Sequence, residues 1–538
     1  MRAVDGFWQV SSRDVWHAFK CEHCTKLAMA VAEKIPEVLE VVEPYREDLS
    51  GKLPIIQGVE FESMLLAELS RNIGDKFLEL DNFSSLDETK VAIASSIPVV
   101  AQARLEAKFG SVLLVGFADL LVRDDYEIVD LEDGSLSARK VRESFSGYTV
   151  WDVKHSVRIK DNYKLQVGGY LLGLRELGVA SQQHSGILGG DRTLHGFDPD
   201  DLVSMFHETR EKLFGFLEAN PPGSFGLEKS FEYMCSKPSI CKEIYCSYPK
   251  LCAATRIEGN LLTQLYRLNH FHADYFREAG VLTIEQLANG PVISDVPRLK
   301  QEIYEEYQRW AKVIQKGRVS EGPEFQLLVP AGEVASLLPE PSQKDMFFDL
   351  EWFTGTGESE DLHYVFGVSD RAEGFEKFVS EDFDQEKVQF EKFVEYTLDK
   401  LEHYPEASIY HYSDPEPKRL ALMSKRHGAL AKEVEQVIGR MFDILPVVRK
   451  SMITSLGSLG IKTLEKYFDS PHAELEDGEG QVEGGLDSML FFHNYQKAIA
   501  AGRQDEASKI LDKIIQYNRA DCVATSRLYD WLKFGLGR

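Results

Sequence analysis

The sequence has few cysteines and no long apolar run, and each shortage excludes a class of protein. Seven cysteines among 538 residues do not supply the dense disulfide framework of small secreted domains. No apolar run approaches the roughly 20 residues that span a bilayer. Residues 1–10 also lack the basic and apolar parts of a secretory signal. We therefore expect a soluble cytoplasmic protein with no membrane partner.

An excess of basic residues is absent as well, because the formal net charge is −26 at pH 7. The phosphates of a nucleic acid are met by cations, so this balance on its own argues against a nucleic-acid partner. A nuclease, however, gathers carboxylates to hold metal ions, and the ions then supply the local positive charge. Net charge therefore leaves a metal-dependent nuclease open.

The length and composition of the chain predict several domains. A chain of 538 residues is too long for one hydrophobic core. Residues 1–255 pass from helical patterns through strands to a group of cysteines, and residues 256–340 are mostly helical in pattern. Residues 341–538 begin at a proline-bearing linker that leads into an apolar strand. We expect an α/β multidomain protein with these three parts.

The middle segment contains the pattern of two short helices joined by a turn. Apolar residues between Leu261 and Phe271 recur at helical spacing, and Gly280 can close that helix. Thr283 and Gln286 then form a capping box that starts another helix. Such a helix-hairpin-helix-like segment can bind a nucleic-acid backbone through helix N-termini, and it can equally serve packing alone. Both interpretations stay open.

Two neighbouring apolar strands of the first segment each carry an acidic residue. Residues 111–121 contain a single carboxylate, Asp119, and a buried strand rarely tolerates one without a partner. The second strand, residues 148–156, carries Asp152 and Lys154, whose side chains share a face because they are two residues apart. The two strands therefore predict a cluster of two carboxylates and one lysine.

The helix expected at residues 160–174 places Gln166 and Tyr170 on one face, because they are four residues apart. Hydrolysis of a phosphodiester at neutral pH requires a metal that activates water and neutralises the phosphate. Carboxylate oxygens suit Mg²⁺ or Mn²⁺, and a nearby lysine can orient water or stabilise charge in the transition state. We expect this chemistry here; the alternative is a surface ion pair at the ends of two strands.

These residues together resemble the RecB-like branch of the PD-(D/E)xK nucleases, which have a restriction-endonuclease-like fold and a Gln-x-x-x-Tyr motif after the lysine strand. In that family an earlier helix offers a His or Glu ligand behind a Gly-x-x-apolar signature, which "IQGVEFESML" matches with Gly58 and Phe61. Glu62 is the counterpart by position, and Glu60 is the competing choice. The resemblance implies that Glu62, Asp119, Asp152 and the backbone carbonyl of Val153 hold the metal, that Lys154 is the catalytic lysine, and that Gln166 and Tyr170 shape the site.

Six of the seven cysteines lie at the two ends of the first segment. These six are Cys21, Cys24, Cys235, Cys241, Cys246 and Cys252. Thiolates at this density suit a zinc ion or an iron–sulfur cluster. Cys522 is isolated and is expected to be a reduced core thiol.

The RecB-like branch includes AddB-type and CRISPR-associated exonucleases in which one cysteine before the nuclease core and three after it bind a 4Fe–4S cluster. That resemblance implies a cluster held by Cys21, Cys241, Cys246 and Cys252. Four residues separate the second and third of these where the family usually has two, so Cys24 or Cys235 is an alternative ligand. Zn²⁺ or free buried thiols are the alternatives to the cluster.

The last segment has an acidic pair on a strand and a Tyr-x-x-x-Asp motif on a late helix. Asp349 and Glu351 share one face of the apolar strand "DMFFDLEWF", and residues 365–368 suit the neighbouring strand. Tyr517 and Asp521 lie one turn apart, at the expected start of a helix. This combination fits a two-metal site in which metals about 4 Å apart clamp one phosphate. The alternative is capping or pairing at a strand end.

This second set resembles the RNase H-like fold of the DEDDy-type exonucleases. The middle motif of that family supplies an Asp after a strand; here Glu416 stands at the matching position, with Asp414 close by and Asp443 as an auxiliary acid. The resemblance implies that Asp349, Glu351, Glu416 and Asp521 bind the metals and that Tyr517 is catalytic, as in a 3′–5′ exonuclease. Because Glu replaces Asp, we expect this domain either to cleave nucleic acid or only to grip it.

The order of the parts resembles a bacterial family of RecB-like nucleases in which a superfamily 1 helicase commonly follows. The stretch "GSLGIKT" has Ile461 where a phosphate-binding loop has Gly, so a helicase would be a separate partner. We expect a nuclease that uses Mg²⁺ or Mn²⁺ on single-stranded or end-containing DNA, with RNA as a further substrate, in repair, recombination or defence. The rival hypothesis is a non-catalytic iron–sulfur scaffold that binds nucleic acid for a partner helicase.

Overall fold

The structure is a computed structural model that forms two compact units, one of residues 1–255 and one of the described residues from 256 onward. The residues that it describes are 1–45, 52–81, 84–224, 238–290, 299–353, 361–413, 415–475, 482 and 484–536. In these ranges, every helix falls short of the length and apolar character that a membrane-spanning helix needs.

The first unit is built on an eight-stranded mixed sheet. Its strands are β1 (Arg2–Val4), β2 (Phe7–Val10), β3 (Phe77–Glu79), β4 (Val99–Phe109), β5 (Val112–Arg123), β8 (Tyr148–Val153), β9 (Ser185–Leu188) and β10 (Leu194–Phe197). The central strands β4, β5 and β8 are antiparallel, and β9 runs parallel to β8. A separate hairpin of β6 (Tyr126–Asp130) and β7 (Leu136–Lys140) connects β5 to β8.

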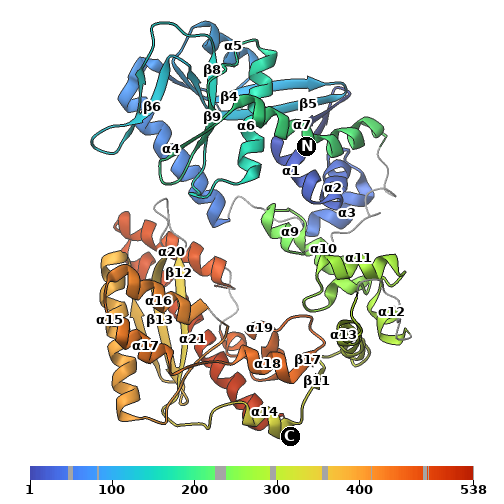
Figure 1. The fold of residues 1–538 in the computed structure, drawn as a ribbon, viewed down its shortest axis with the longest axis vertical. Coiled ribbons are helices and arrows are strands. Elements are labelled where there is room, and N and C mark those ends of the chain that lie inside the picture. The colour runs from blue at the N-terminus through green and yellow to red at the C-terminus, as the bar shows by residue number, and fades with distance from the viewer. Residues whose placement is uncertain are drawn as a thin grey trace. The chain divides into compact units, whose positions relative to one another are not determined.

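Helices cover both faces of this sheet. They are α1 (Ser12–Lys20), α2 (Glu22–Ala32), α3 (Pro36–Val42), α4 (Leu53–Ile73), α5 (Leu86–Ala94), α6 (Asp161–Glu176), α7 (Pro199–Ala219), α9 (Pro238–Glu243) and α10 (Pro249–Glu258). Apolar residues of α4 pack in one core cluster, and those of α6 and α7 pack in another (Figure 1). The predicted strands and helix therefore correspond to β5, β8 and α6, although β8 ends at Val153 and leaves Lys154 just beyond it.

The second unit contains a five-stranded sheet in the order β14-β13-β12-β15-β16. Its strands are β12 (Met346–Phe353), β13 (Leu362–Asp370), β14 (Phe375–Val379), β15 (Ile409–His411) and β16 (Met441–Asp443). The first three form an antiparallel meander, whereas β15 and β16 run parallel to β12. β12 therefore lies at the centre, with the predicted partner strand β13 beside it.

The residues of β12 alternate between two helical layers. Its even-numbered apolar residues, such as Phe348, pack against α15 (Phe383–His403), α16 (Pro415–His427) and α17 (Ala431–Ile438). Phe347 packs on the opposite face, in the core cluster that includes residues of α21 (Gln504–Asp530) (Figure 1). Asp349 and Glu351 share the face of Phe347 because side chains two apart point the same way. The acidic pair is thus directed toward α21.

Further helices of the second unit follow β16 and belong to the layer that contains α21. They are α18 (Leu445–Ser451), α19 (Ile461–Leu464), α20 (Gly485–Ala500) and the π-helical end of the chain, η6 (Trp531–Gly535). The helix α21 begins at Gln504, so Tyr517 and Asp521 lie well inside it rather than at its start, as the sequence predicted.

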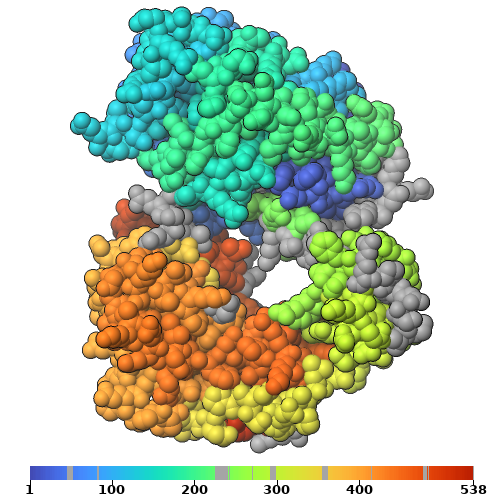
Figure 2. All heavy atoms as spheres, viewed as in Figure 1, coloured from blue at the N-terminus to red at the C-terminus, as the bar shows by residue number. Residues whose placement is uncertain are grey.

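Residues 256–340 add helices and one small strand pair to the same unit. These elements are η3 (Leu262–Gln264), α11 (His270–Glu278), α12 (Ile284–Asn289), α13 (Gln301–Val319) and α14 (Ala331–Ser336), with β11 (Phe325–Leu327) paired to β17 (Met452–Thr454). Their apolar residues share a core cluster with Phe347 and Tyr529. In the space-filling view the yellow residues around β11 and α14 lie against the orange and red C-terminal residues (Figure 2).

The predicted helix between Leu261 and Phe271 is wrong. The chain forms a 3-10 turn at Leu262–Gln264, and Arg267 adopts a left-handed backbone with φ 59°. A left-handed residue ends a right-handed helix, so the helix α11 starts only after Asn269 caps it. The second predicted helix and its capping box of Thr283 and Gln286 are confirmed.

Candidate functional site

The first candidate site lies where β5 and β8 separate. The backbone pairing of β5 with β8 ends at Leu120 and Trp151. Asp119 and Asp152 occupy the next two positions that face each other across these strands. Oδ2 of Asp119 accepts a hydrogen bond of 2.7 Å from the backbone N–H of Val153. The sheet itself therefore brings the two predicted carboxylates together.

Lys154 joins this pair of carboxylates. Its Nζ lies 2.6 Å from Oδ2 of Asp152 and 3.9 Å from Oδ2 of Asp119. Burial lowers the pKa of Lys154, but the charges of Asp152 and Asp119 outweigh it, and the pKa is raised overall. The lysine therefore stays protonated and acts as a fixed positive charge.

Tyr170 and Gln166 of α6 close one side of the same cluster. The Gln166 amide donates a hydrogen bond of 2.6 Å to the hydroxyl of Tyr170. Burial raises the pKa of Tyr170, and the charges of Asp152 and Asp119 raise it further. A Cβ on Gly116 would lie 2.4 Å from the Tyr170 ring, so the ring packs directly on the β5 backbone. The predicted helix face thus meets the predicted strand.

Glu62 approaches the cluster from α4. Burial and the charge of Asp119 raise the pKa of Glu62 to about 7. Its Oε1 accepts a hydrogen bond from the side-chain amide of Gln102 on β4. Burial lowers the pKa of His155, and the charge of Glu60, the competing candidate, only partly opposes that lowering. The geometry favours Glu62 as the acid directed at Asp119.

Asp152 has the environment of a cation ligand. Its side chain is fully buried, and burial raises the pKa of Asp152 well above its ordinary value, with Lys154 lowering and Asp119 raising it. Among the described residues, no donor is placed to make a hydrogen bond with its Oδ1. A buried carboxylate oxygen without a donor is unfavourable unless a cation or proton meets it. The donor set therefore fits a Mg²⁺ or Mn²⁺ ion.

Five cysteines of the first unit have buried side chains. They are Cys21, Cys24, Cys241, Cys246 and Cys252, whereas Cys235 lies outside the described residues. The Sγ atoms of Cys24 and Cys246 are 3.6 Å apart, although these cysteines are 222 positions apart in sequence. The backbone N–H of Cys24 donates to Sγ of Cys21 over 3.4 Å. The structure thus brings the two predicted groups together, with Cys24 in direct contact with the later group.

The second candidate site contains three carboxylates on two elements. Asp349 and Glu351 of β12 and Asp521 of α21 each offer an oxygen, and these oxygens all lie within 4.8 Å of one another. Burial and then the charges of Asp521 and Glu351 raise the pKa of Asp349 well above its ordinary value. Burial and the charge of Asp521 raise the pKa of Glu351 to about 8. Three crowded oxygen donors fit a divalent Mg²⁺ or Mn²⁺.

Neutral side chains contact two of the three acids. Asn518 donates a hydrogen bond of 2.7 Å to Oδ2 of Asp349. The hydroxyl of Tyr364 lies 3.3 Å from Oε2 of Glu351 and 2.6 Å from Oγ of Ser488. These contacts involve one oxygen of each acid, so the other oxygen of each acid is not engaged by them.

The close approach of α21 to β13 sets this geometry. Gly367 is paired with Asp349 on the neighbouring strand, and its carbonyl accepts a hydrogen bond of 3.2 Å from the thiol of Cys522. A Cβ on Gly367 would lie 1.8 Å from Oδ1 of Asn518. Only glycine lets the helix come this near.

Replacing Gly367 with alanine is expected to disturb the site indirectly, through Asn518. The added methyl group must displace Asn518, whose amide holds Asp349, and overpacking of this kind costs about 1–3 kcal/mol of folding stability. The melting temperature and the affinity of this cluster for Mn²⁺ should both decline. Gly460→Ala is the control, because the nearest neighbour of its Cβ is 3.6 Å away. An unchanged Gly367→Ala variant would contradict the close packing.

Tyr517 and His472 border the acidic cluster. Burial and the charges of Asp521 and Glu351 raise the pKa of Tyr517, so its hydroxyl stays protonated. His472 lies between Glu465, at 2.6 Å from its Nδ1, and Asp521, at 3.4 Å from its Nε2. Burial lowers the pKa of His472, but these two acids outweigh it and raise the pKa to about 9. A cationic histidine therefore contacts one of the candidate ligands.

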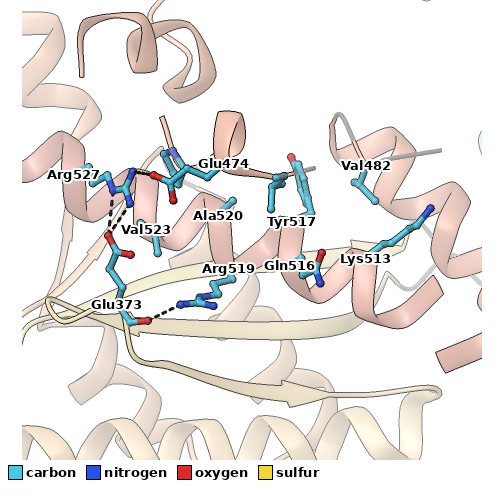
Figure 3. Close-up of a pocket in the computed structure, with 12 residues that line it drawn as sticks. Glu373, Glu474, Val482, Lys513, Gln516, Tyr517, Arg519, Ala520, Val523 and Arg527 are labelled. Carbon is cyan, nitrogen blue, oxygen red and sulfur yellow. Dashed lines mark hydrogen bonds and ion pairs between the residues drawn. The ribbon is translucent and has the colours of Figure 1, made fainter. Parts of the chain in front are cut away.

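A cavity of about 570 Å³ follows α21 on the other side of Tyr517 (Figure 3). Arg527 crosses one end of it, with ion pairs of 2.8 Å to Glu373 and 2.5 Å to Glu474. The remaining lining residues are Pro471, Leu475, Val482, Lys513, Gln516, Arg519, Ala520 and Val523. Tyr517 is the wall that this cavity shares with the acidic cluster.

Glu416 lies near the second cluster but outside the group of three. It is buried in the first turn of α16, and its Oε2 is 3.3 Å from Nδ1 of His411. Its charge contributes to the raised pKa of Asp349, behind burial and the nearer acids Asp521 and Glu351. Asp443 accepts hydrogen bonds from backbone N–H groups of Ser413 and Leu445. Asp414, the neighbouring candidate, lies outside the described residues.

The raised pKa of Glu351 predicts how stability depends on pH. A folded-state value of about 8, against an ordinary 4.5, means that the folded chain holds this proton more tightly than the unfolded chain. The resulting stabilisation is complete below pH 4.5 and is lost as the pH rises through about 8.

In chelated protein, thermal scans at a series of pH values should show a steeper loss of stability toward pH 8 for the unsubstituted chain than for Glu351→Gln. Mn²⁺ should reduce that loss, because the cation favours the ionised carboxylates. A variant with the same pH slope as the unsubstituted protein would show that Glu351 does not titrate as expected.

Three contributors to these sites were not found from the sequence. His472 begins a Gly/Glu-rich stretch whose composition is typical of an exposed loop, yet its side chain is only 15% exposed. Asn518 is next to the Tyr-x-x-x-Asp motif but carries no charge, and Gln102 lies in an ordinary strand sequence. The one available signal was the glutamate-rich context of His472, since a histidine among acids is often paired.

Comparison with known families supports the second site. The family model of the RNase H superfamily matches residues 346–533. This range includes β12 and α21, and therefore Asp349, Glu351 and Asp521. The chain matches no curated protein and no solved structure. The C-terminal part of the chain is accordingly an RNase H-like domain.

Proposed function

We propose that this chain is a metal-dependent nuclease with two hydrolytic sites, one in each unit. The observation that carries the proposal is the group formed by Asp349, Glu351 and Asp521, whose oxygens lie within 4.8 Å of one another. This group lies inside the RNase H-like domain, a fold of nucleic-acid hydrolases. Crowded carboxylates that raise one another's pKa are unfavourable without a cation, which supports a metal-binding role over a structural one.

In the second site, Asp349, Glu351 and Asp521 would hold divalent metal. Bound metal of this kind activates water and neutralises the scissile phosphate. Tyr517 keeps its proton, so it is suited to donate a hydrogen bond to a phosphate or water oxygen. Lys462 lies 4.2 Å from the centroid of the Tyr517 ring and brings positive charge to an acidic region.

The cavity beside Tyr517 is where we place part of the substrate. Val523 and Leu475 offer apolar surface to a nucleobase, and Lys513 and Arg519 offer cations to a phosphate. A strand whose phosphate reaches the acidic cluster would extend past Tyr517 into this space. The cavity thus suits a single strand, in keeping with an exonuclease of the DEDDy type.

In the first site, the proposed metal ligands are Glu62, Asp119 and Asp152, and the proposed activity is that of a PD-(D/E)xK deoxyribonuclease. Lys154 remains protonated beside two acids, so it is suited to orient water or stabilise phosphate charge rather than to accept a proton. Tyr170 and Gln166 limit the space on the α6 side. DNA with a free end or a single-stranded region is the substrate that we assign to this site.

The buried cysteines are proposed to hold a 4Fe–4S cluster that ties the two ends of the first unit. The 3.6 Å contact between Cys24 and Cys246 supports a shared site and makes Cys24 a ligand candidate equal to Cys21. Hydrogen bonding to Cys24 and burial raise the pKa of Cys246, against the lowering effect of Cys241. Without a positive ion the Cys246 thiol stays protonated. Protein purified without oxygen should be brown with absorbance near ~400 nm, whereas colourless, zinc-loaded protein would favour Zn²⁺.

The direct test of the proposal uses the purified chain and end-labelled single-stranded DNA, double-stranded DNA and RNA. With Mn²⁺ we expect progressive shortening of at least one DNA substrate, and a chelator should stop it. If every substrate stays intact with Mn²⁺ and with Mg²⁺, the enzyme proposal fails and a non-catalytic binding scaffold is left.

A further inference from the structure

The strands β4 and β5 exchange faces in the middle of the first unit's sheet. On β4, Ala101 packs in the core cluster under α4, whereas Ala103 packs in the cluster under α6 and α7. On β5, Leu120 and Ala118 show the same change. Residues two apart on a regular strand share a face, so both strands rotate between these positions.

The rotation falls on one residue of each strand. The pairing of β4 with β5 runs from Ala101 and Leu120 to Ala103 and Ala118, and it omits Gln102 and Asp119. Irregularities of this kind re-aim side chains next to active sites. Gln102 is therefore opposite the candidate metal ligand Asp119.

The backbone of Gln102 adopts an unusual conformation at this bend. It has φ 56°, a left-handed conformation in the middle of a strand, which is uncommon for a residue other than glycine. Glycine would adopt it with little strain. Strained residues of this type cluster at functional sites, and they persist where the surrounding structure holds them in place. The backbone alone does not require glutamine at this position.

The side chain of Gln102 has one specific contact toward the site. Its amide donates a hydrogen bond to Oε1 of Glu62, which joins β4 to α4. Glu62 lies near enough to Asp119 and Lys154 for their charges to act on it. A neutral amide can hold this glutamate among other acids without cancelling its charge.

We propose that Gln102 is a positioning residue of the first site, which bends β4 opposite Asp119 and holds Glu62 in place for a metal ion. This inference rests on the proposed function of that site. The amide fixes one oxygen of Glu62 and leaves the other free to face the ion. Partners of metal ligands commonly contribute about 10–100-fold to metal affinity.

Two substitutions separate the amide from the backbone. Gln102→Gly keeps the left-handed conformation and removes the whole side chain, whereas Gln102→Met keeps the length of the side chain and replaces its amide with a thioether that cannot donate a hydrogen bond. Gln183→Met is the matched control, because the side-chain amide of Gln183 donates to the backbone carbonyl of Asp124 and not to a member of the acidic cluster. If one Gln102 variant does not fold, the other still tests the proposal.

The measurement is Mn²⁺ binding, followed by electron paramagnetic resonance of the free ion, in an Asp349→Asn/Asp521→Asn background that silences the second site. We expect both Gln102 variants to weaken Mn²⁺ binding about tenfold and Gln183→Met to leave it unchanged. In a Glu62→Ala background, the Gln102 substitutions should have no further effect. A merely structural residue would act equally in both backgrounds.

Two results would overturn the inference in distinguishable ways. Mn²⁺ binding that is unaffected by either Gln102 variant, or weakened equally with and without Glu62, would refute the role of Gln102 while leaving the first site intact. A first site that binds no Mn²⁺ and cleaves no DNA in the unsubstituted protein would refute the proposed function, and the role of Gln102 with it.

Discussion

Replacing Asp349 with asparagine should lower cleavage by the RNase H-like domain by more than about a hundredfold, because even the partners of metal ligands typically contribute 10–100-fold. In metal-free protein the same substitution should raise thermal stability. Asp349 is partly buried beside two other carboxylates, and burial with the charges of Asp521 and Glu351 raises its pKa. An asparagine of the same shape removes that repulsion and retains the contact with Asn518.

The experiment is best done in an Asp152→Ala background, so that the first site does not obscure the loss. Cleavage of labelled DNA and RNA and thermal unfolding are measured on the same preparations. Asp399→Asn is the control, because Asp399 is exposed on α15 and its side chain forms an exposed ion pair with His403. A loss of both activity and stability would indicate a structural role for Asp349.

Replacing Lys154 with methionine should abolish cleavage by the first site and destabilise its unit by about 3 kcal/mol, since removing one partner of a buried ion pair leaves the other charge unpaired. The partner is Asp152, which is fully buried and 2.6 Å from the lysine. The loss should grow with pH, because at low pH Asp152 takes up a proton and no charge is left unpaired.

The double substitution Asp152→Asn/Lys154→Met should recover most of the stability while remaining inactive. Lys212→Met is a matched control: its Nζ lies 3.7 Å from Glu22 and its side chain is 55% exposed, and exposed pairs contribute about 0–1 kcal/mol. Denaturant unfolding gives the free energies. A Lys154→Met variant as stable as the unsubstituted protein would show that Lys154 does not compensate a buried charge on Asp152.

Much of both sites follows from residue spacing along regular elements. Asp119 and Asp152 were predicted from single carboxylates in apolar strands, and the structure places them in opposed positions. Asp349 and Glu351 alternate with apolar residues on β12, so their common face follows from the period of a strand. Tyr517 and Asp521 are one helical turn apart wherever their helix begins, which is why the wrong helix start did not affect their placement.

The features that were missed depend on contacts between distant segments. The proposed role of Gln102 depends on a left-handed backbone conformation, which no local sequence pattern predicts. His472 contacts Asp521, 49 positions later, only because the chain returns to α21. The helix predicted around Leu265 had the right apolar spacing, but tertiary packing favoured a 3-10 turn there.

For the cysteines and Glu416, the ligands implied by the family resemblance differ from the contacts found in the structure. The resemblance placed Cys21 in the cluster, whereas the thiol of Cys24 lies 3.6 Å from that of Cys246. Glu416 is buried near Asp349, yet its carboxylate is engaged by His411. Its role as a metal ligand stays a prediction. The relative positions of distant backbone segments decide such cases, and a sequence pattern does not give those positions.

The existence of two independent hydrolytic sites is tested most directly by comparing the unsubstituted chain with Asp152→Ala, Asp349→Ala and the double variant. Degradation of labelled single-stranded DNA, double-stranded DNA and RNA is measured with Mn²⁺. We expect each single variant to retain part of the activity, with a different preference among the substrates, and the double variant to retain none. A double variant that still degrades nucleic acid, or a single substitution that removes all activity, would contradict the two-site proposal.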